Sequence, residues 1–276
     1  MAGIILIIAN IVFSYQGFTN EMFFERYKFE VDKVLLYKDY KRLITGNFLH
    51  VSWLHLIFNM IALYAFSGAV IANLGVFRFL IVYFGSMIGG DLLALFVHRN
   101  HPDYSSVGAS GAISGLIFAS IAVFPGMGMG LFLIPISIPA WIFGLLFIAY
   151  SIYGIKSQNY NIGHEAHLGG ALVGMLIALL FEPAAFAQNY LVILLILLPS
   201  LAFIYLILTR PHILLIDNLY FKTHSDFYSI DHQYNYEKQS RQEELDMILD
   251  KISRKGMRSL SRSEKQKLKE YSRDAH

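Results

Sequence analysis

Two residues that together can form an activated nucleophile, a serine and a histidine, each lie in an apolar and glycine-rich part of the sequence. Ser110 stands in Gly108-Ala109-Ser110-Gly111, and His167 stands in Ala166-His167-Leu168-Gly169-Gly170. A histidine within hydrogen-bond reach of a serine is the minimal arrangement for nucleophilic catalysis. Small neighbours would let a bulky carbonyl approach Ser110, and N–H groups at a helix start can hold an oxyanion.

The same glycines fit a purely structural interpretation. Gly111 and Gly115 are four residues apart, and so are Gly170 and Gly174. Such G-x-x-x-G pairs are typical of helices that cross closely within a membrane. A histidine at the edge of an apolar stretch also often caps a helix or lies at an interface. Taken alone, neither segment decides between chemistry and packing.

A third polar group, His50, His55 and Asn59, precedes the other two. His55 and Asn59 are four residues apart, so on a helix their side chains project from one face. Polar groups at membrane depth are costly and are functional candidates. Hydrogen bonding between helices is the alternative explanation for them.

A metal site is a weaker possibility. His164, Glu165 and His167 resemble the H-E-x-x-H zinc motif, but the two histidines are three residues apart and the motif needs four. His50, His55 and His167 offer another set of nitrogen ligands. We nevertheless expect no metal and no cofactor.

The elements that position these residues are those of a membrane protein. Of the 276 residues, 55% are hydrophobic and 15% are charged, and the mean hydropathy is +0.49. A soluble domain of this length has too little interior for so much apolar surface. The net charge of +2 indicates no nucleic-acid partner, and the absence of cysteine excludes disulfides and thiolate metal sites.

Seven apolar stretches approach the ~20 residues that a helix needs to cross a bilayer. We expect the first, although short, to be retained as a span. The stretches lie at about Ala2–Phe13, Leu54–Asn73, Phe77–Val97, Ser110–Phe124, Leu131–Tyr153, His167–Phe181 and Tyr190–Leu208.

Two regions differ from these stretches. Residues 17–53 form a long loop with six Lys/Arg, five Asp/Glu and many aromatic rings, which suits the headgroup level of a bilayer. The last 68 residues carry 13 Lys/Arg and 11 Asp/Glu, against nine of each in the first 208. We expect a soluble tail over 211–276. A helical hairpin at about 240–272 is expected there, its second helix starting at a Ser261/Glu264 capping box.

Together, the three polar groups resemble the motifs of the rhomboid family of intramembrane serine proteases. The resemblance covers roughly residues 1–183. It implies an all-α polytopic fold with a six-helix core over 1–183, to which we add a seventh transmembrane span over 184–210. It also implies transmembrane protein substrates within a lipid bilayer, with small or helix-breaking residues near the cut. The expected location is the inner membrane of a bacterial cell.

The resemblance further implies a role for each site residue. Ser110 would be the nucleophile and His167 the general base and then acid, with no triad carboxylate. The oxyanion would be stabilised by His55, Asn59 and the Ser110 N–H. The remaining implied roles are site shaping for His50, a place beside the nucleophile for Gly111, and close helix approach for Gly170 and Gly174.

Two positions depart from the family pattern. A Trp-Arg pair is common in the first loop, where this chain has Lys41 and Arg42. An aromatic residue that packs on the catalytic histidine commonly stands four residues after the nucleophile, where this chain has Ser114.

Two other functions compete with proteolysis. One is a catalytically silent rhomboid-like binder of transmembrane helices, against which the presence of Ser110 and His167 argues. The other is a transporter, but the sequence shows no repeat halves. The family implies a cytoplasmic N-terminus and a site open to the outer face, whereas the basic residues of the first loop favour the reverse orientation.

Overall fold

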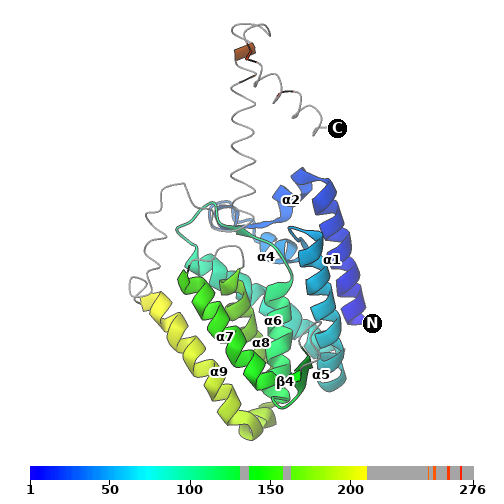
Figure 1. The fold of residues 1–276 in the computed structure, drawn as a ribbon, viewed down its shortest axis with the longest axis vertical. Coiled ribbons are helices and arrows are strands. Elements are labelled where there is room, and N and C mark those ends of the chain that lie inside the picture. Colours follow the sequence, from blue (N-terminus) through cyan, green and yellow to red (C-terminus); the bar gives the residue numbers. More distant parts are fainter. Residues whose placement is uncertain are drawn as a thin grey trace. The chain divides into compact units, whose positions relative to one another are not determined.

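A computed structural model describes residues 1–130, 137–157 and 163–209, together with Ile248, Lys251, Ile252, Leu260, Ser261 and Leu268. The tail hairpin predicted at about 240–272 lies outside the described residues, apart from these isolated positions. The chain is mostly helical (Figure 1). Its helices are α1 (Ala2–Thr19), α2 (Glu21–Tyr27), α3 (Val31–Leu35), α4 (Arg42–Thr45), a 3-10 turn η1 (Gly46–Phe48), α5 (Trp53–Val97), α6 (Ser110–Val123), α7 (Ala140–Ser157), α8 (His164–Phe181) and α9 (Pro183–Thr209).

The described residues form two short antiparallel ladders. Strand β1 (Phe29–Glu30) pairs with β2 (Ser105–Ser106), which ties the first loop to the segment that precedes α6. Strand β3 (Gly128–Gly130) pairs with β4 (Ser137–Pro139). The predicted helix that begins at residue 131 is therefore wrong for residues 137–139, since α7 begins only at Ala140.

The two predicted stretches at 54–73 and 77–97 belong to a single 45-residue element, α5, which breaks at Gly75. There φ is 80° and ψ is 165°, a conformation that a residue with a Cβ rarely adopts. At 1.5 Å per residue, α5 is about twice as long as one bilayer crossing requires. The break thus divides α5 into two membrane-length halves.

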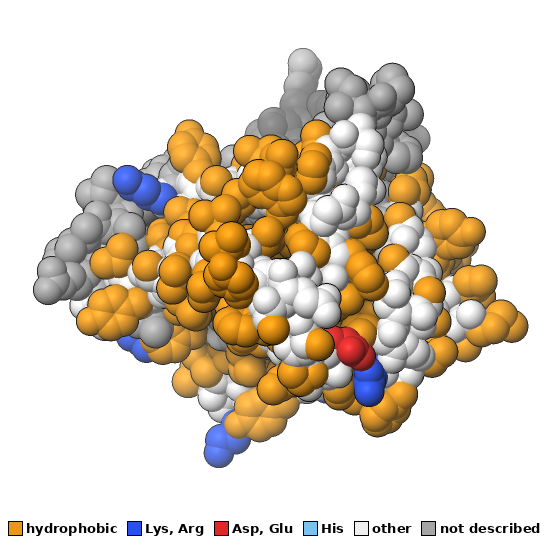
Figure 2. Space-filling view, turned by 90° about the horizontal axis from the view of Figure 1, so that it is seen from below, with side chains coloured by type: hydrophobic (Ala, Val, Ile, Leu, Met, Phe, Trp, Pro, Cys, Tyr) orange, Lys and Arg blue, Asp and Glu red, His pale blue; other side chains and the backbone are white. Residues whose placement is uncertain are grey.

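Within the part of the chain that the structure describes, four helices are long and apolar enough to cross a membrane: α1, α5, α8 and α9 up to Ile207. Helices α6 and α7 are shorter and also apolar. Large apolar side chains point outward from these helices, among them Phe77 (76% exposed) and Leu180 (77% exposed). Seen from below, the molecule has a mostly hydrophobic surface with few charged groups (Figure 2). Such a surface suits lipid rather than water.

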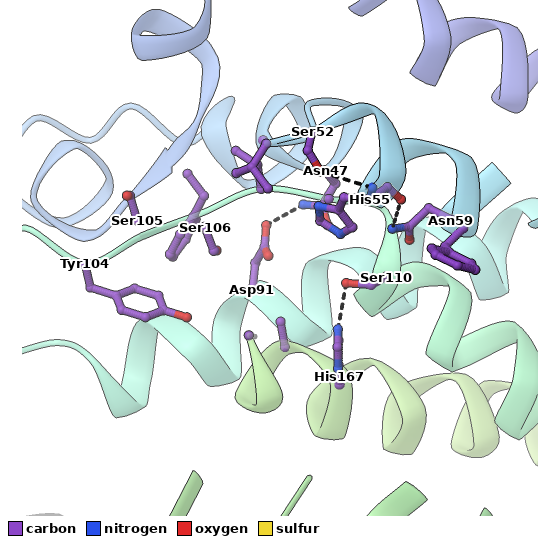
Figure 3. A pocket seen from close by; sticks show the side chains of 18 of the residues that line it. Asn47, Ser52, His55, Asn59, Asp91, Tyr104, Ser105, Ser106, Ser110 and His167 are labelled. Atoms are coloured by element: carbon purple, nitrogen blue, oxygen red, sulfur yellow. Dashed lines mark hydrogen bonds between the residues drawn. The ribbon is translucent and has the colours of Figure 1, made fainter. Parts of the chain in front are cut away.

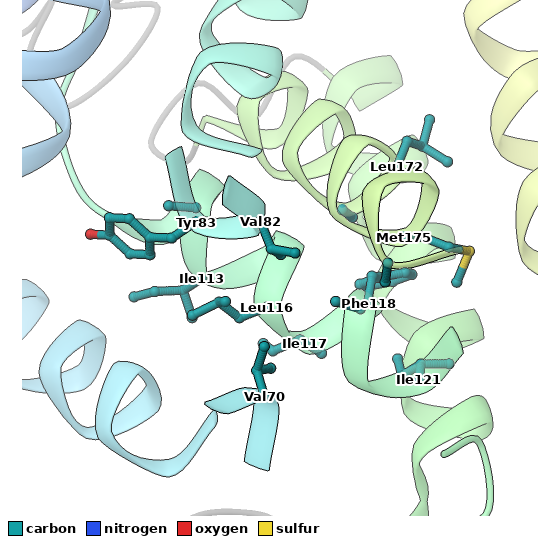
Figure 4. Close-up of a cluster of buried hydrophobic side chains, with 14 of the residues drawn as sticks. Val70, Val82, Tyr83, Ile113, Leu116, Ile117, Phe118, Ile121, Leu172 and Met175 are labelled. Carbon is teal, nitrogen blue, oxygen red and sulfur yellow. The ribbon is translucent and has the colours of Figure 1, made fainter. Parts of the chain in front are cut away.

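Helix α6 lies at the centre of the bundle, between α5, α7 and α8 (Figure 1). Every residue from Gly111 to Ala122 is buried, as expected for a helix that is apolar on all sides. Leu116 of α6 packs in the same apolar cluster as Tyr83 of α5 and Met175 of α8 (Figure 4).

Glycines set the separation of α6 and α8. A Cβ added at Gly170 would overlap the carbonyl oxygen of Gly111, and one at Gly174 would overlap that of Gly115. The two helix backbones are therefore in direct contact along one stripe. Because Ser110 precedes Gly111 and His167 precedes Gly170 by less than one turn, this contact also brings the two polar residues together.

Arg42 organises the first loop. Its Nη1 donates to the carbonyl oxygens of Glu25 and Lys28, at 3.0 and 2.8 Å, and its Nε donates to Asp39 Oδ2 at 3.0 Å. The guanidinium is buried, whereas the side chain of the neighbouring Lys41 is half exposed and pairs with Asp39. Arg42 thus links the short helices of the loop into one folded layer.

Candidate active site

Ser110 and His167 meet at the N-terminal ends of α6 and α8. Ser110 is the first residue of α6, and His167 lies in the first turn of α8. His167 Nε2 is 2.7 Å from Ser110 Oγ, a hydrogen-bond distance (Figure 3). The serine hydroxyl can therefore pass its proton directly to the imidazole.

The backbone just before Ser110 makes room for His55. Gly108 has φ +124°, and a Cβ there would lie 2.8 Å from His55 Cε1. Only glycine combines this conformation with this contact. The Gly108 N–H donates to the Gly46 carbonyl oxygen at 3.2 Å, so the first loop also holds this segment.

His55 and Asn59 lie on α5 and face the same cavity as Ser110 (Figure 3). The Ser52 hydroxyl caps α5 by accepting a hydrogen bond from the His55 N–H at 3.2 Å. Asn59 Nδ2 donates to the His55 carbonyl oxygen at 3.0 Å. Its amide group has a second N–H, which can serve a bound oxyanion.

His50 lies behind His55 and not on the cavity wall. It is fully buried, and its Nδ1 shares a 2.9 Å hydrogen bond with Ser14 Oγ of α1. Its ring packs edge-on against the His55 ring, with centroids 4.9 Å apart. His50 can therefore act on the site only by positioning His55.

An aromatic ring packs beside His167, but it comes from α7. The Phe147 and His167 ring centroids are 6.0 Å apart. Ser114, at the position where the family often has this ring, donates instead to the Ser110 carbonyl oxygen at 2.7 Å. Sequence reasoning missed Phe147 because only the packing of α7 brings it to the site.

The cavity at the pair has a volume of about 450 Å³. It continues from Ser110 and His167 to a second polar region at Asn47 and Asp91, whose side chains are joined by a 2.7 Å hydrogen bond. Asp91 is an acid within an apolar stretch of the sequence, and an acid at membrane depth is a functional candidate, although no motif assigns it a role. The remaining wall residues are Phe29, Gly46, Val51, Ser52, Leu54, His55, Phe58, Asn59, Tyr104, Ser105, Ser106, Val107, Gly108, Gly163 and Ala166.

Glu165 belongs to a neighbouring buried cluster. Its Oε1 lies 3.3 Å from His98 Nε2, at the end of α5. The His98 ring stacks on Tyr104 at 3.6 Å and shares an Nδ1–Nδ1 contact of 3.3 Å with His101. Glu165 thus ties the first turn of α8 to the end of α5. Within the described ranges, no three His, Asp or Glu side chains form a metal-binding group.

Glu165→Ala is expected to lower the free energy of unfolding by about 1–3 kcal/mol, because it removes the buried partner of His98. Glu182→Ala is the matched control, because it breaks an ion pair with Arg78 whose side chains are 41% and 38% exposed. Exposed pairs contribute about 0–1 kcal/mol. Denaturant unfolding in detergent compares the two variants, and equal losses would contradict a structural role for Glu165.

The fold and this site define a multi-pass membrane protein with a serine–histidine pair inside its helical bundle. A model of the rhomboid domain matches residues 37–184, more than half of the chain. The chain therefore belongs to the rhomboid family of intramembrane proteases, as its motifs predicted. A second model, of a family of unknown function, matches residues 228–274.

Individual relatives come from bacteria and mitochondria. Over 150 residues the chain is 34% identical to rhomboid protein 1, mitochondrial, of Saccharomyces cerevisiae, covering 52% of this chain and 43% of the relative. It is 35% identical over 142 residues to the putative rhomboid protease YdcA of Bacillus subtilis (50% and 66%). It is also 32% identical over 173 residues to the rhomboid protease GluP of the same species (62% and 32%). The match to the yeast protein spans less than half of that protein's length.

Proposed function

We propose that this protein is an intramembrane serine endopeptidase that hydrolyses transmembrane segments of other membrane proteins. The observation that carries the proposal is the 2.7 Å contact between His167 Nε2 and Ser110 Oγ at a cavity within the helical bundle. Family membership supports the same reaction class. Both catalytic groups are half-buried, so substrate can reach them from the cavity.

In the first half of the reaction, Ser110 Oγ attacks the scissile carbonyl carbon while its proton passes to His167 Nε2. The oxyanion that forms accepts hydrogen bonds from the Ser110 N–H, from Asn59 and from His55. His167 then donates its proton to the leaving amine, and the C–N bond breaks. An acyl group remains on Ser110 Oγ.

In the second half, water attacks the acyl carbon and gives a proton to His167. The C–O bond to Ser110 breaks, the carboxyl product leaves, and the proton returns to Ser110 Oγ. Glu165 faces His98, so His167 works without a carboxylate partner. Packing against Phe147 supplies the orientation that a triad acid gives elsewhere.

The proposed membrane organisation assigns six crossings to residues 1–183. They are α1, the two halves of α5, α6, α7 and α8. Helix α9 is the seventh span, within 184–210, and residues 211–276 form a soluble tail. The proposed location is a bacterial inner membrane, with a cytoplasmic N-terminus and a site open to the outer face. The motif resemblance supports this orientation, although the charge of the first loop favours the opposite one.

The test is cleavage of single-span substrates by the purified full-length chain in liposomes. Substrates carry small or helix-breaking residues near the centre of the span. Production of two fragments by the wild type, and none by Ser110→Ala, is expected. The alternative function, a silent binder of transmembrane helices, predicts co-purification of intact substrate with both proteins and no fragments from either.

A further inference from the structure

Asp91 is a buried acid at the active-site cavity for which the proposed reaction has no use. The residue is 3% exposed and lies on the second half of α5. Its Oδ2 accepts a hydrogen bond from Asn47 Nδ2, and among the described residues Oδ1 accepts none (Figure 3). No Lys, Arg or His of the described chain forms an ion pair with it.

A carboxylate held this way lacks a charge partner. Burying a charge in a membrane protein is costly unless it is paired with an opposite charge or faces a polar cavity. Asn47 is a neutral donor whose amide also reaches the Leu43 carbonyl oxygen at 3.3 Å, so it offers one N–H only. The described residues thus leave one side of the carboxylate for a donor that comes from the cavity.

Backbone contacts place Asp91 close to the catalytic pair. Its neighbour Gly90 lies against the carbonyl oxygen of Ala166, because a Cβ there would be 2.5 Å from that atom. Ala166 directly precedes His167, and a Cβ added at Gly111, the residue after Ser110, would be 3.3 Å from the same Ala166 oxygen. A substrate residue adjacent to the scissile bond can therefore reach this part of the cavity.

The cavity wall combines apolar groups with the buried acid. Phe29, Val107 and Ala166 line the same cavity as Asp91. A lysine or arginine side chain has an aliphatic stem and a terminal cation, so its stem can contact the apolar wall while its charge reaches the acid. A charged nitrogen bonded to a carboxylate makes a short and strong hydrogen bond.

We propose that Asp91 is a specificity-determining residue, which accepts the side chain of a lysine or arginine next to the scissile bond. The inference rests on the proposed function. A lysine inside a transmembrane segment is costly in lipid. Transfer of that side chain from the bilayer to Asp91 would therefore favour binding of such a segment.

The test is a substrate series in liposomes. The substrates are single-span proteins made in pairs, and the two members of a pair differ only in having Lys or Met at one position. The pairs together cover each of the five positions on either side of the cut. Met is the control because it has a similar length and no charge. The ratio of kcat/KM for Lys over Met is measured for the wild type, Asp91→Asn, Asp91→Glu and Glu182→Gln. The last variant removes an acid outside the cavity, which pairs with Arg78.

At one position the wild type should cleave the Lys substrate at least about 10-fold better than the Met substrate, as expected for one charge-assisted hydrogen bond. Asp91→Asn should remove this preference and keep the Met rate within about threefold. Asp91→Glu and Glu182→Gln should retain it. If the wild type shows no preference for Lys at any of the positions, the wild-type data alone overturn the proposal. Equal losses on both substrates in a folded Asp91→Asn protein would also overturn it.

Failure of this inference differs from failure of the proposed function. If the chain is not a protease, it cleaves neither substrate series, and a fluorophosphonate does not label Ser110. If only the inference fails, cleavage and labelling persist and the charge of the substrate has no effect. Labelling of Asp91→Asn also shows that its catalytic pair is assembled.

Discussion

Ser110→Ala and His167→Ala should each lower kcat/KM for a transmembrane substrate by at least about 10³-fold, because each removes one end of the proton transfer. The double variant should lose no more than either single variant, since the two residues act as one unit. Asn59→Ala should retain partial activity, with a loss of about 10²–10³-fold in kcat, the usual effect of removing one oxyanion donor. Single-turnover cleavage in liposomes measures all four proteins.

Ser114→Ala is the control for these losses. Its hydroxyl is one helical turn from Ser110 and donates only to the Ser110 carbonyl oxygen. Its activity should stay within a few-fold of the wild type. Residual cleavage in Ser110→Ala that equals the wild type, or a loss in Ser114→Ala as large as that in Ser110→Ala, would contradict the assignment of the nucleophile.

Gly170→Ala is expected to impair both folding and activity. The added methyl would overlap the Gly111 carbonyl oxygen, which is a backbone atom and cannot turn away. Forcing extra volume into a packed interior costs about 1–3 kcal/mol. Because α8 must then move away from α6, His167 moves away from Ser110. Cleavage should therefore fall at least about 100-fold, since a small misplacement of a catalytic group has an effect of this size.

The matched control is Gly68→Ala, on α5. A Cβ at Gly68 meets no atom within 4 Å. Since alanine is the better helix former, this variant should be as stable as the wild type or more stable by up to about 1 kcal/mol. Unfolding in detergent and cleavage in liposomes are measured on both variants. Equal stability and equal activity of Gly170→Ala and the wild type would show that the close approach of α6 and α8 is not required.

The membrane character of the fold and its family were predictable from the sequence. Long apolar stretches interrupted by Gly75 and by the polar segment around 98–109 already mark where the helices end, and the family model confirms the resemblance that the three motifs indicated. The ladder β3–β4 was missed because apolar residues continue through it. Residues 137–139 therefore read as part of the span expected from residue 131, and their pairing with residues 128–130 separates them from α7.

The site was predictable where short spacings decide it and not where packing decides it. His55 and Asn59 are one turn apart, so their common face follows from the spacing. Phe147 and Asn47 reach the site from α7 and the first loop, which no local pattern indicates. His50 belongs to the same motif as His55, but packing places it differently. The Ser14 hydroxyl of α1 holds His50 behind His55, and only His55 of the two lines the cavity.

The proposed reaction depends on the activation of Ser110 as a nucleophile by His167. The most direct measurement is labelling of the full-length protein with a fluorophosphonate in detergent, followed by mass spectrometry of the modified peptide. The wild type should carry the label on Ser110, and Ser110→Ala and His167→Ala should carry none. Absence of label on the folded wild type, or undiminished labelling of Ser110→Ala, would contradict it.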